Sequence, residues 1–248
     1  MRVDLLYGRD GLTVELGDEL DVHVIEKPAM PLIDDPAAAV ARALAAPVGA
    51  PPLAALAADA RSACILVCDI TRPVPNHLFL RPVVEILLAA GIAADAITVL
   101  IATGLHRPNE GDELAEVIGD AWVLETVRIE NHFARDDSAH VDLGPTPTMG
   151  TPVKLDRRFV DADLRIATGL VEPHFMAGWS GGRKVIAPGV AHADTITTFH
   201  SARFMEHAMS SSVSSSVPSR SNSTARNLGV VSESAISGRD YNASKAKR

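Results

Sequence analysis

Apolar runs that alternate with helical segments constrain the fold of this chain more than any other feature. Residues 62–69, 96–102 and 164–171 are short, mostly apolar runs, a pattern typical of strands buried on both faces. Residues 76–90 and 109–118 place apolar side chains at helical spacing. Strands that alternate with helices indicate parallel pairing. We therefore predict an α/β fold with an open, mostly parallel sheet flanked by helices.

The N-terminal region has a different pattern. Residues 2–7, 12–16 and 22–26 are short strand candidates separated by Gly and Asp, which predicts a small antiparallel β unit. Residues 36–46 are rich in alanine and follow two aspartates, which predicts a capped helix.

Residues 209–248 differ sharply in composition from the rest of the chain. They contain 13 serines and a net charge of +4, whereas the first 208 residues contain 4 serines and a net charge of −12. Their few apolar residues cannot offset the entropy lost on ordering. We predict one α/β domain over residues 1–208 and a disordered, serine-rich tail over residues 209–248. The tail is either natural or the product of a reading-frame change near His207.

Charge and hydropathy exclude several classes of function. The net charge of −8 argues against nucleic acid as a partner. The apolar runs are too short to span a membrane, and the N-terminus lacks a signal-peptide pattern. Cys64 and Cys68 lie in one apolar run and are predicted to be reduced thiols in the core. We therefore expect a cytoplasmic protein without a membrane partner.

Polar motifs follow each of the three predicted buried strands. Asp69-Ile-Thr-Arg72-Pro follows the first strand, and Thr103-Gly-Leu-His106-Arg follows the second. Glu172-Pro-His174 and the turn Gly178-Trp-Ser-Gly-Gly-Arg-Lys184 follow the third. The carboxyl ends of parallel strands meet at one edge of the sheet, where ligands bind. The sequence therefore predicts one site built from all three motifs.

The residue types in these motifs can bind ligands and take part in catalysis. Glycines let a backbone approach a ligand closely. A desolvated lysine can bind an anion or form a covalent bond, and histidines serve as proton shuttles or metal ligands.

The glycine turn partly matches two common sequence motifs. Gly178-Trp-Ser180-Gly-Gly182 matches the pattern of a serine hydrolase, but that fold needs the serine directly after a strand, and residues 172–177 intervene. The turn is not a phosphate-binding P-loop, because Arg183 separates Gly182 from Lys184. A serine hydrolase is therefore the weaker alternative.

Together the motifs resemble the nickel-dependent lactate racemases and related 2-hydroxy-acid racemases and epimerases. The resemblance runs from about Asp69 to Phe204 and includes His200-Ser201. It implies a nickel-pincer nucleotide, a pyridinium mononucleotide with two thio-acid arms that hold nickel.

The resemblance also implies roles for particular residues. His106 and His174 are the implied acid/base pair, Lys184 is the covalent attachment point of the cofactor, and His200 is the nickel ligand. The full implied set of cofactor-binding residues is Asp69, Thr71, Arg72, Ser180, Gly181, Gly182, Lys184 and His200.

The implied reaction is racemisation or epimerisation of a small, lactate-like 2-hydroxy acid. Removing the α-hydrogen as hydride avoids a carbanion beside a carboxylate, while one histidine takes the hydroxyl proton. The resulting keto acid rotates, hydride returns to the opposite face and the other histidine donates the proton. Arg72 and Arg107 are candidates to hold the substrate carboxylate.

The implied partners are the substrate and the enzymes that make and load the cofactor. Members of this family are longer and have a second domain that closes over the cofactor. The resemblance therefore leaves a second hypothesis, in which this chain is a truncated, catalytically silent domain that still binds the cofactor.

Overall fold

The computed structural model describes residues 1–8, 10–25, 29–174, 178–204 and 228–231. The chain divides into two compact units, Met1–Asp34 and Asp35–Arg248. Among the helices in these ranges, none has the length and apolar character needed to cross a membrane.

A β-hairpin forms the ordered part of the N-terminal unit. β1 (Arg2–Leu5) pairs antiparallel with β2 (Leu12–Glu15). The connecting turn contains Gly8 and Gly11, both with positive φ, a conformation that glycine adopts without a steric penalty. The predicted small antiparallel β unit is confirmed.

The prediction of a third strand in this unit, at residues 22–26, is wrong. Residues 22–25 form no strand, and Glu26 lies outside the described residues. Val24 and Ile25 are 39% and 89% exposed. These apolar side chains have no buried face to pack on, and an apolar run forms a strand only where a neighbour pairs with it.

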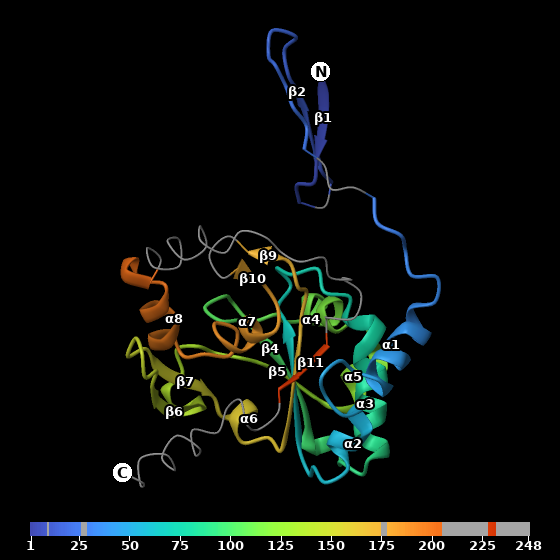
Figure 1. Cartoon of the computed structure of the whole chain (residues 1–248), viewed down its shortest axis with the longest axis vertical. Helices are drawn as coiled ribbons and strands as arrows, with labels where there is room; N and C mark the ends of the chain where they lie inside the picture. Colours follow the sequence, from blue (N-terminus) through green and yellow to red (C-terminus); the bar gives the residue numbers. More distant parts are fainter. Residues whose placement is uncertain (9, 26–28, 175–177, 205–227, 232–248) are drawn as a thin grey trace. The chain divides into compact units, whose positions relative to one another are not determined.

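A five-stranded sheet forms the centre of the second unit (Figure 1). The strand order is β11-β8-β3-β4-β5, in which β11 is antiparallel to β8 and the other pairs are parallel. The predicted α/β fold with a mostly parallel sheet is confirmed. The strands are β3 (Ala63–Cys68), β4 (Ile97–Ala102), β5 (Arg128–Asn131), β8 (Leu164–Thr168) and β11 (Leu228–Val231).

Two hydrophobic clusters lie on the two faces of this sheet. Along β3, Ile65 and Val67 belong to one cluster, and Cys64 and Leu66 belong to the other, because successive side chains of a strand alternate between faces. The first cluster is covered by α1 (Pro36–Ala45), α2 (Leu53–Ala57), α3 (Asn76–Ala89), α4 (Asp112–Ile118) and α5 (Ala121–Thr126). The second is covered by α6 (Arg157–Val160) and α7 (Arg183–Ile186).

Further elements lie beside the main sheet. β6 (His140–Pro145) pairs antiparallel with β7 (Pro152–Asp156), and α8 (Ala193–Phe199) packs against β7 (Figure 1). The remaining short elements are η1 (Ala94–Ala96), η2 (Asp137–Ala139), β9 (Pro173–His174) and β10 (Gly178–Trp179).

Side-chain hydrogen bonds explain where two of the helices begin. Asp35 caps α1 as predicted, because its carboxylate accepts a hydrogen bond of 2.9 Å from the main-chain N–H of Ala38. α4 begins at Asp112 instead of the predicted residue 109. Asn109 is fixed in the preceding loop, where its side chain accepts a hydrogen bond of 3.2 Å from the N–H of Ile70.

The predicted serine-rich tail falls mostly outside the described residues, which omit 205–227 and 232–248. Its described segment, Leu228–Val231, forms β11 on the edge of the sheet. The sequence pattern did not predict this strand. The domain boundary at residue 208 stays a prediction.

Replacing Leu80 by Ala is expected to lower the free energy of unfolding by about 2–5 kcal/mol. Leu80 is fully buried between α3 and the sheet, so its removal leaves a cavity. Leu78 lies on the same helix and is 38% exposed, so Leu78→Ala should change the same quantity by only about 0.5 kcal/mol. Urea unfolding of both variants makes the comparison, and equal losses would contradict the packing described.

Candidate functional site

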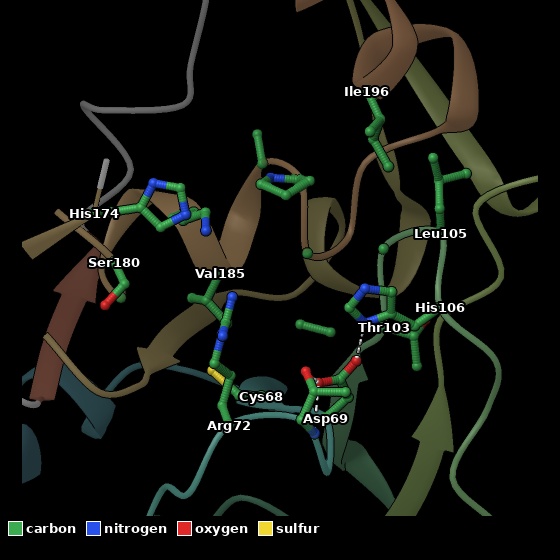
Figure 2. Close-up of a pocket in the computed structure, with 18 of the residues that line it drawn as sticks. Cys68, Asp69, Arg72, Thr103, Leu105, His106, His174, Ser180, Val185 and Ile196 are labelled. Carbon is green, nitrogen blue, oxygen red and sulfur yellow. Dashed lines mark hydrogen bonds and ion pairs between the residues drawn. The ribbon is translucent and has the colours of Figure 1, made fainter. Parts of the chain in front are cut away.

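A cavity of about 520 Å³ opens where the loops after β3, β4 and β8 meet (Figure 2). Its lining includes residues from all three polar motifs, together with residues from α7 and α8. The predicted site residues that line it are Asp69, Thr71, Arg72, His106, His174, Ser180, Gly181, Lys184 and His200. Gly182 lies directly before α7, with φ of +49°. The structure thus brings every predicted acid/base and cofactor-binding residue except Gly182 to the lining of one cavity.

Asp69 holds His106 in a defined orientation. Asp69 follows β3 and is 5% exposed, and its Oδ2 lies 2.5 Å from Nδ1 of His106 (Figure 2). Its other oxygen accepts hydrogen bonds from the hydroxyl and the N–H of Thr71, at 2.6 and 3.1 Å. A carboxylate beside Nδ1 places the ring hydrogen on that nitrogen and leaves the lone pair on Nε2. His106 can therefore accept a proton through Nε2.

Ser180 stabilises the glycine turn through its hydroxyl group. The hydroxyl donates a hydrogen bond of 2.7 Å to the carbonyl of Leu170 and accepts one of 3.0 Å from the N–H of Glu172. At Gly181, with φ of +68°, a Cβ atom would lie 2.8 Å from the same carbonyl oxygen, so only glycine fits. The turn is thus packed tightly onto the end of β8, and the Ser180 hydroxyl serves main-chain groups rather than a catalytic base.

Lys184 lies half-buried on α7 and faces the cavity. Burial lowers the pKa of its ammonium group, and the positive charge of Arg72 lowers that pKa further. In the ranges that the structure describes, no ion pair to Lys184 is found. A lysine with a lowered pKa has a larger share of the neutral, nucleophilic amine.

His174 and His200 approach the same cavity from β9 and from the end of α8. Burial lowers the pKa of His174, and Lys184, Arg72 and His200 lower it further by charge repulsion. In His200, Nδ1 donates a hydrogen bond of 2.8 Å to the carbonyl of Ile196. This contact leaves Nε2 of His200 with a lone pair that can bind a metal ion.

The two arginines proposed for carboxylate binding differ in position. Arg72 lines the cavity. Arg107 makes two hydrogen bonds of 2.6 Å with Glu113 and is absent from the cavity lining. The structure therefore leaves Arg72 as the arginine that faces a ligand.

The sequence motifs did not indicate the apolar side of the cavity or the Cys68 thiol that lines it. Leu105, Ile196 and Phe199 provide apolar surface, and no polar motif pointed to α8 before His200. Cys68 also lines the cavity, and burial raises the pKa of its thiol to about 11. Its position at the end of a predicted buried strand was the available signal.

Comparison with known proteins identifies relatives over most of the chain. Residues 7–212 match the family described as the lactate racemase N-terminal domain. The chain is 34% identical over 206 residues to a lactate racemase of Lactiplantibacillus plantarum, covering 82% of this chain and 48% of that protein. It is 32% identical over 209 residues to a lactate racemase of Thermoanaerobacterium thermosaccharolyticum, covering 83% of this chain and 48% of that protein.

Solved structures agree with the sequence comparison. The lactate racemase apoprotein from Thermoanaerobacterium thermosaccharolyticum superposes with a TM-score of 0.70 at 32% identity, over 83% of this chain and 48% of that one. A Thermotoga maritima protein shares the fold, with a TM-score of 0.52 at 24% identity, over 70% of this chain and 44% of that one. The chain spans about half the length of the curated relatives that it matches.

Replacing Arg72 by Met is expected to raise the pKa of Lys184, because one of the two causes of its lowering is removed. Burial remains the larger cause, so the pKa should stay below the usual value of 10.5. The pH dependence of Lys184 acetylation, followed by peptide mass spectrometry, measures this change. Arg107→Met is the matched control and should have no effect, and an unchanged Lys184 profile in Arg72→Met would contradict the charge arrangement.

Proposed function

The chain belongs to the lactate racemase family, whose N-terminal domain it matches, and we propose that it racemises or epimerises a small, lactate-like 2-hydroxy acid. The proposed cofactor is the nickel-pincer nucleotide. The observation that carries the proposal is the placement of two imidazoles, His106 and His174, on opposite sides of the cavity that Lys184 also faces (Figure 2).

The cavity suits this cofactor in size and charge. A volume of about 520 Å³ lies within the range of about 300–1,000 Å³ typical of small-molecule sites. Arg72 can pair with a phosphate, and the lowered pKa of Lys184 favours covalent attachment. When bound, the cofactor supplies an acceptor for the hydride that leaves C2 of the substrate.

His200, which lines the cavity, is the proposed protein ligand of nickel. Among the described residues, no group of three or more His, Cys, Asp or Glu side chains forms a metal site. His200 would offer Nε2 as a protein ligand to a nickel ion that the cofactor brings with it.

His106 and His174 are the proposed acid/base pair. Asp69 keeps the hydrogen of His106 on Nδ1, so Nε2 can take the hydroxyl proton of one enantiomer. The lowered pKa of His174 keeps its ring neutral near pH 7, which suits a base for the other enantiomer. Arg72 is proposed to hold the substrate carboxylate or the cofactor phosphate. Thr71 orients Asp69, and Ser180, Gly181 and Gly182 shape the turn around Lys184.

The runner-up function is a cofactor-binding domain that is catalytically silent by itself. The similarity to lactate racemases extends over 48% of each of the two curated relatives. The serine hydrolase alternative loses support, because the Ser180 hydroxyl bonds to main-chain groups.

Covalent attachment of the cofactor can be tested at Lys184. Protein made alongside the cofactor's synthesis and loading enzymes, its proposed partners, should carry an adduct detectable by intact-mass analysis. Lys184→Ala should remove the adduct. Lys154, which pairs with Asp194 outside the cavity, is the matched control, and Lys154→Ala should retain it. An adduct that survives Lys184→Ala would refute the assignment.

The two-base proposal predicts different defects for the two enantiomers. His106→Ala and His174→Ala should each lower full racemisation by about 10²–10⁴-fold in cofactor-loaded protein, because the cycle uses both bases. In single-turnover oxidation, each variant should lose mainly one enantiomer. His200→Ala should instead lose bound nickel, measured by elemental analysis. Undiminished racemisation in either His106→Ala or His174→Ala would exclude the two-base mechanism.

A further inference from the structure

His132 is a buried histidine outside the cavity, and its ring contacts two hydrogen-bond acceptors. It lies one residue beyond β5 and is 1% exposed. Nδ1 lies 3.0 Å from Oδ2 of Asp156, and Nε2 lies 3.1 Å from the carbonyl oxygen of Ala191. A carbonyl and an ionised carboxylate can only accept hydrogen bonds. The ring of His132 is thus held between an acceptor on Asp156 and an acceptor on Ala191.

The Asp156 carboxylate that His132 contacts is itself held by charged side chains. Burial by itself raises the pKa of Asp156, but hydrogen bonds from Arg158 and His132 outweigh it and hold this pKa well below its usual range. Arg158 also pairs with Glu130, and the ring of His140 meets the ring of His132 edge to face at 5.1 Å. A buried carboxylate that is paired and hydrogen-bonded in this way is tolerated, so Asp156 is a fixed acceptor beside His132.

The main chain of His132 is bonded to the loop that carries His106. The N–H of His132 donates a hydrogen bond of 3.1 Å to the carbonyl of Ile101 in β4. The hydroxyl of Thr103 donates one of 2.7 Å to the carbonyl of His132. Thr103 stands three residues before His106 and lines the cavity.

The side chain of His132 is bonded to the segment that leads into α8. Ala191 lies two residues before the start of α8, which ends directly before His200. The same segment is held by a hydrogen bond of 2.7 Å from the N–H of Ala193 to the carbonyl of Ala134. His132 therefore joins the His106 loop to the helix that carries His200.

We propose that His132 is a positioning residue that fixes the His106 loop relative to α8, so that His106 and His200 face the same ligand. The catalytic consequence of this inference rests on the proposed racemase function. The positioning role itself rests only on the contacts of His132. A displacement of about 1 Å between reacting groups costs about 100-fold in rate. Loss of the His132 contacts is therefore expected to lower kcat about 100-fold with little change in KM.

The test uses the full chain labelled with ¹⁵N-histidine and observed by NMR without cofactor. The ring signals of His106 and His200 in the wild-type protein are the reference. His132→Phe retains a ring but has no donor, and should shift the ring signals of His106 and His200. His132→Gln has a donor for only one of the two acceptors and should shift the same signals by less.

Leu87→Ala is the matched control for a general loss of stability. Leu87 is fully buried in the first hydrophobic cluster, on α3. Leu87→Ala should lower the melting temperature at least as much as His132→Phe and leave the His106 and His200 signals in place. In cofactor-loaded protein, kcat should fall only in the His132 variants.

His106 and His200 signals that do not move in the His132 variants would overturn the proposal. If His132→Phe does not fold, His132→Gln decides the question. Wild-type protein that lacks racemisation would defeat the proposed function and leave the NMR result valid.

Discussion

The parallel pairing of β3 with β4 and β8 is the constraint on which the rest of the structure depends. It turns the carboxyl ends of the three strands toward one edge of the sheet, so the loops that follow them meet. The contact between Asp69 and His106 joins two of these loops across 37 residues of sequence. The glycine turn packs onto the end of the third strand through Ser180. Without this pairing, the three motifs would not meet at one cavity.

The electrostatics of the cavity reconcile two requirements of the proposed reaction. An anionic substrate and a phosphate need positive charge, whereas acid/base chemistry needs imidazoles that are neutral near pH 7. Burial and the proximity of Arg72 lower the pKa of Lys184, and the same effects, with Lys184 itself, lower the pKa of His174. The groups that attract anions thus also favour the neutral form of His174.

Much of the fold could be predicted from the sequence, because the central strands are apolar runs with few alternative structures. The convergence of the three motifs followed from parallel pairing, and the roles of their residues from the family resemblance. Contacts set by tertiary structure could not be predicted: the orientation of His106 by Asp69, the link from His132 to Ala191, and the pairing that removes Arg107 from the site. The prediction of a strand at residues 22–26 was wrong for the same reason, because the sequence pattern could not show whether a neighbouring strand pairs with this segment.

We propose that this cavity racemises a 2-hydroxy acid by moving the α-hydrogen as hydride. An isotope experiment distinguishes hydride transfer from proton exchange: a single enantiomer of lactate deuterated at C2 is incubated in ordinary water with the cofactor-loaded chain. The product enantiomer is then analysed by chiral separation and mass spectrometry. We expect the opposite enantiomer to form and to retain deuterium at C2, because the hydride never exchanges with solvent. An opposite enantiomer that carries hydrogen from water, or the absence of any opposite enantiomer, would exclude hydride transfer in this cavity.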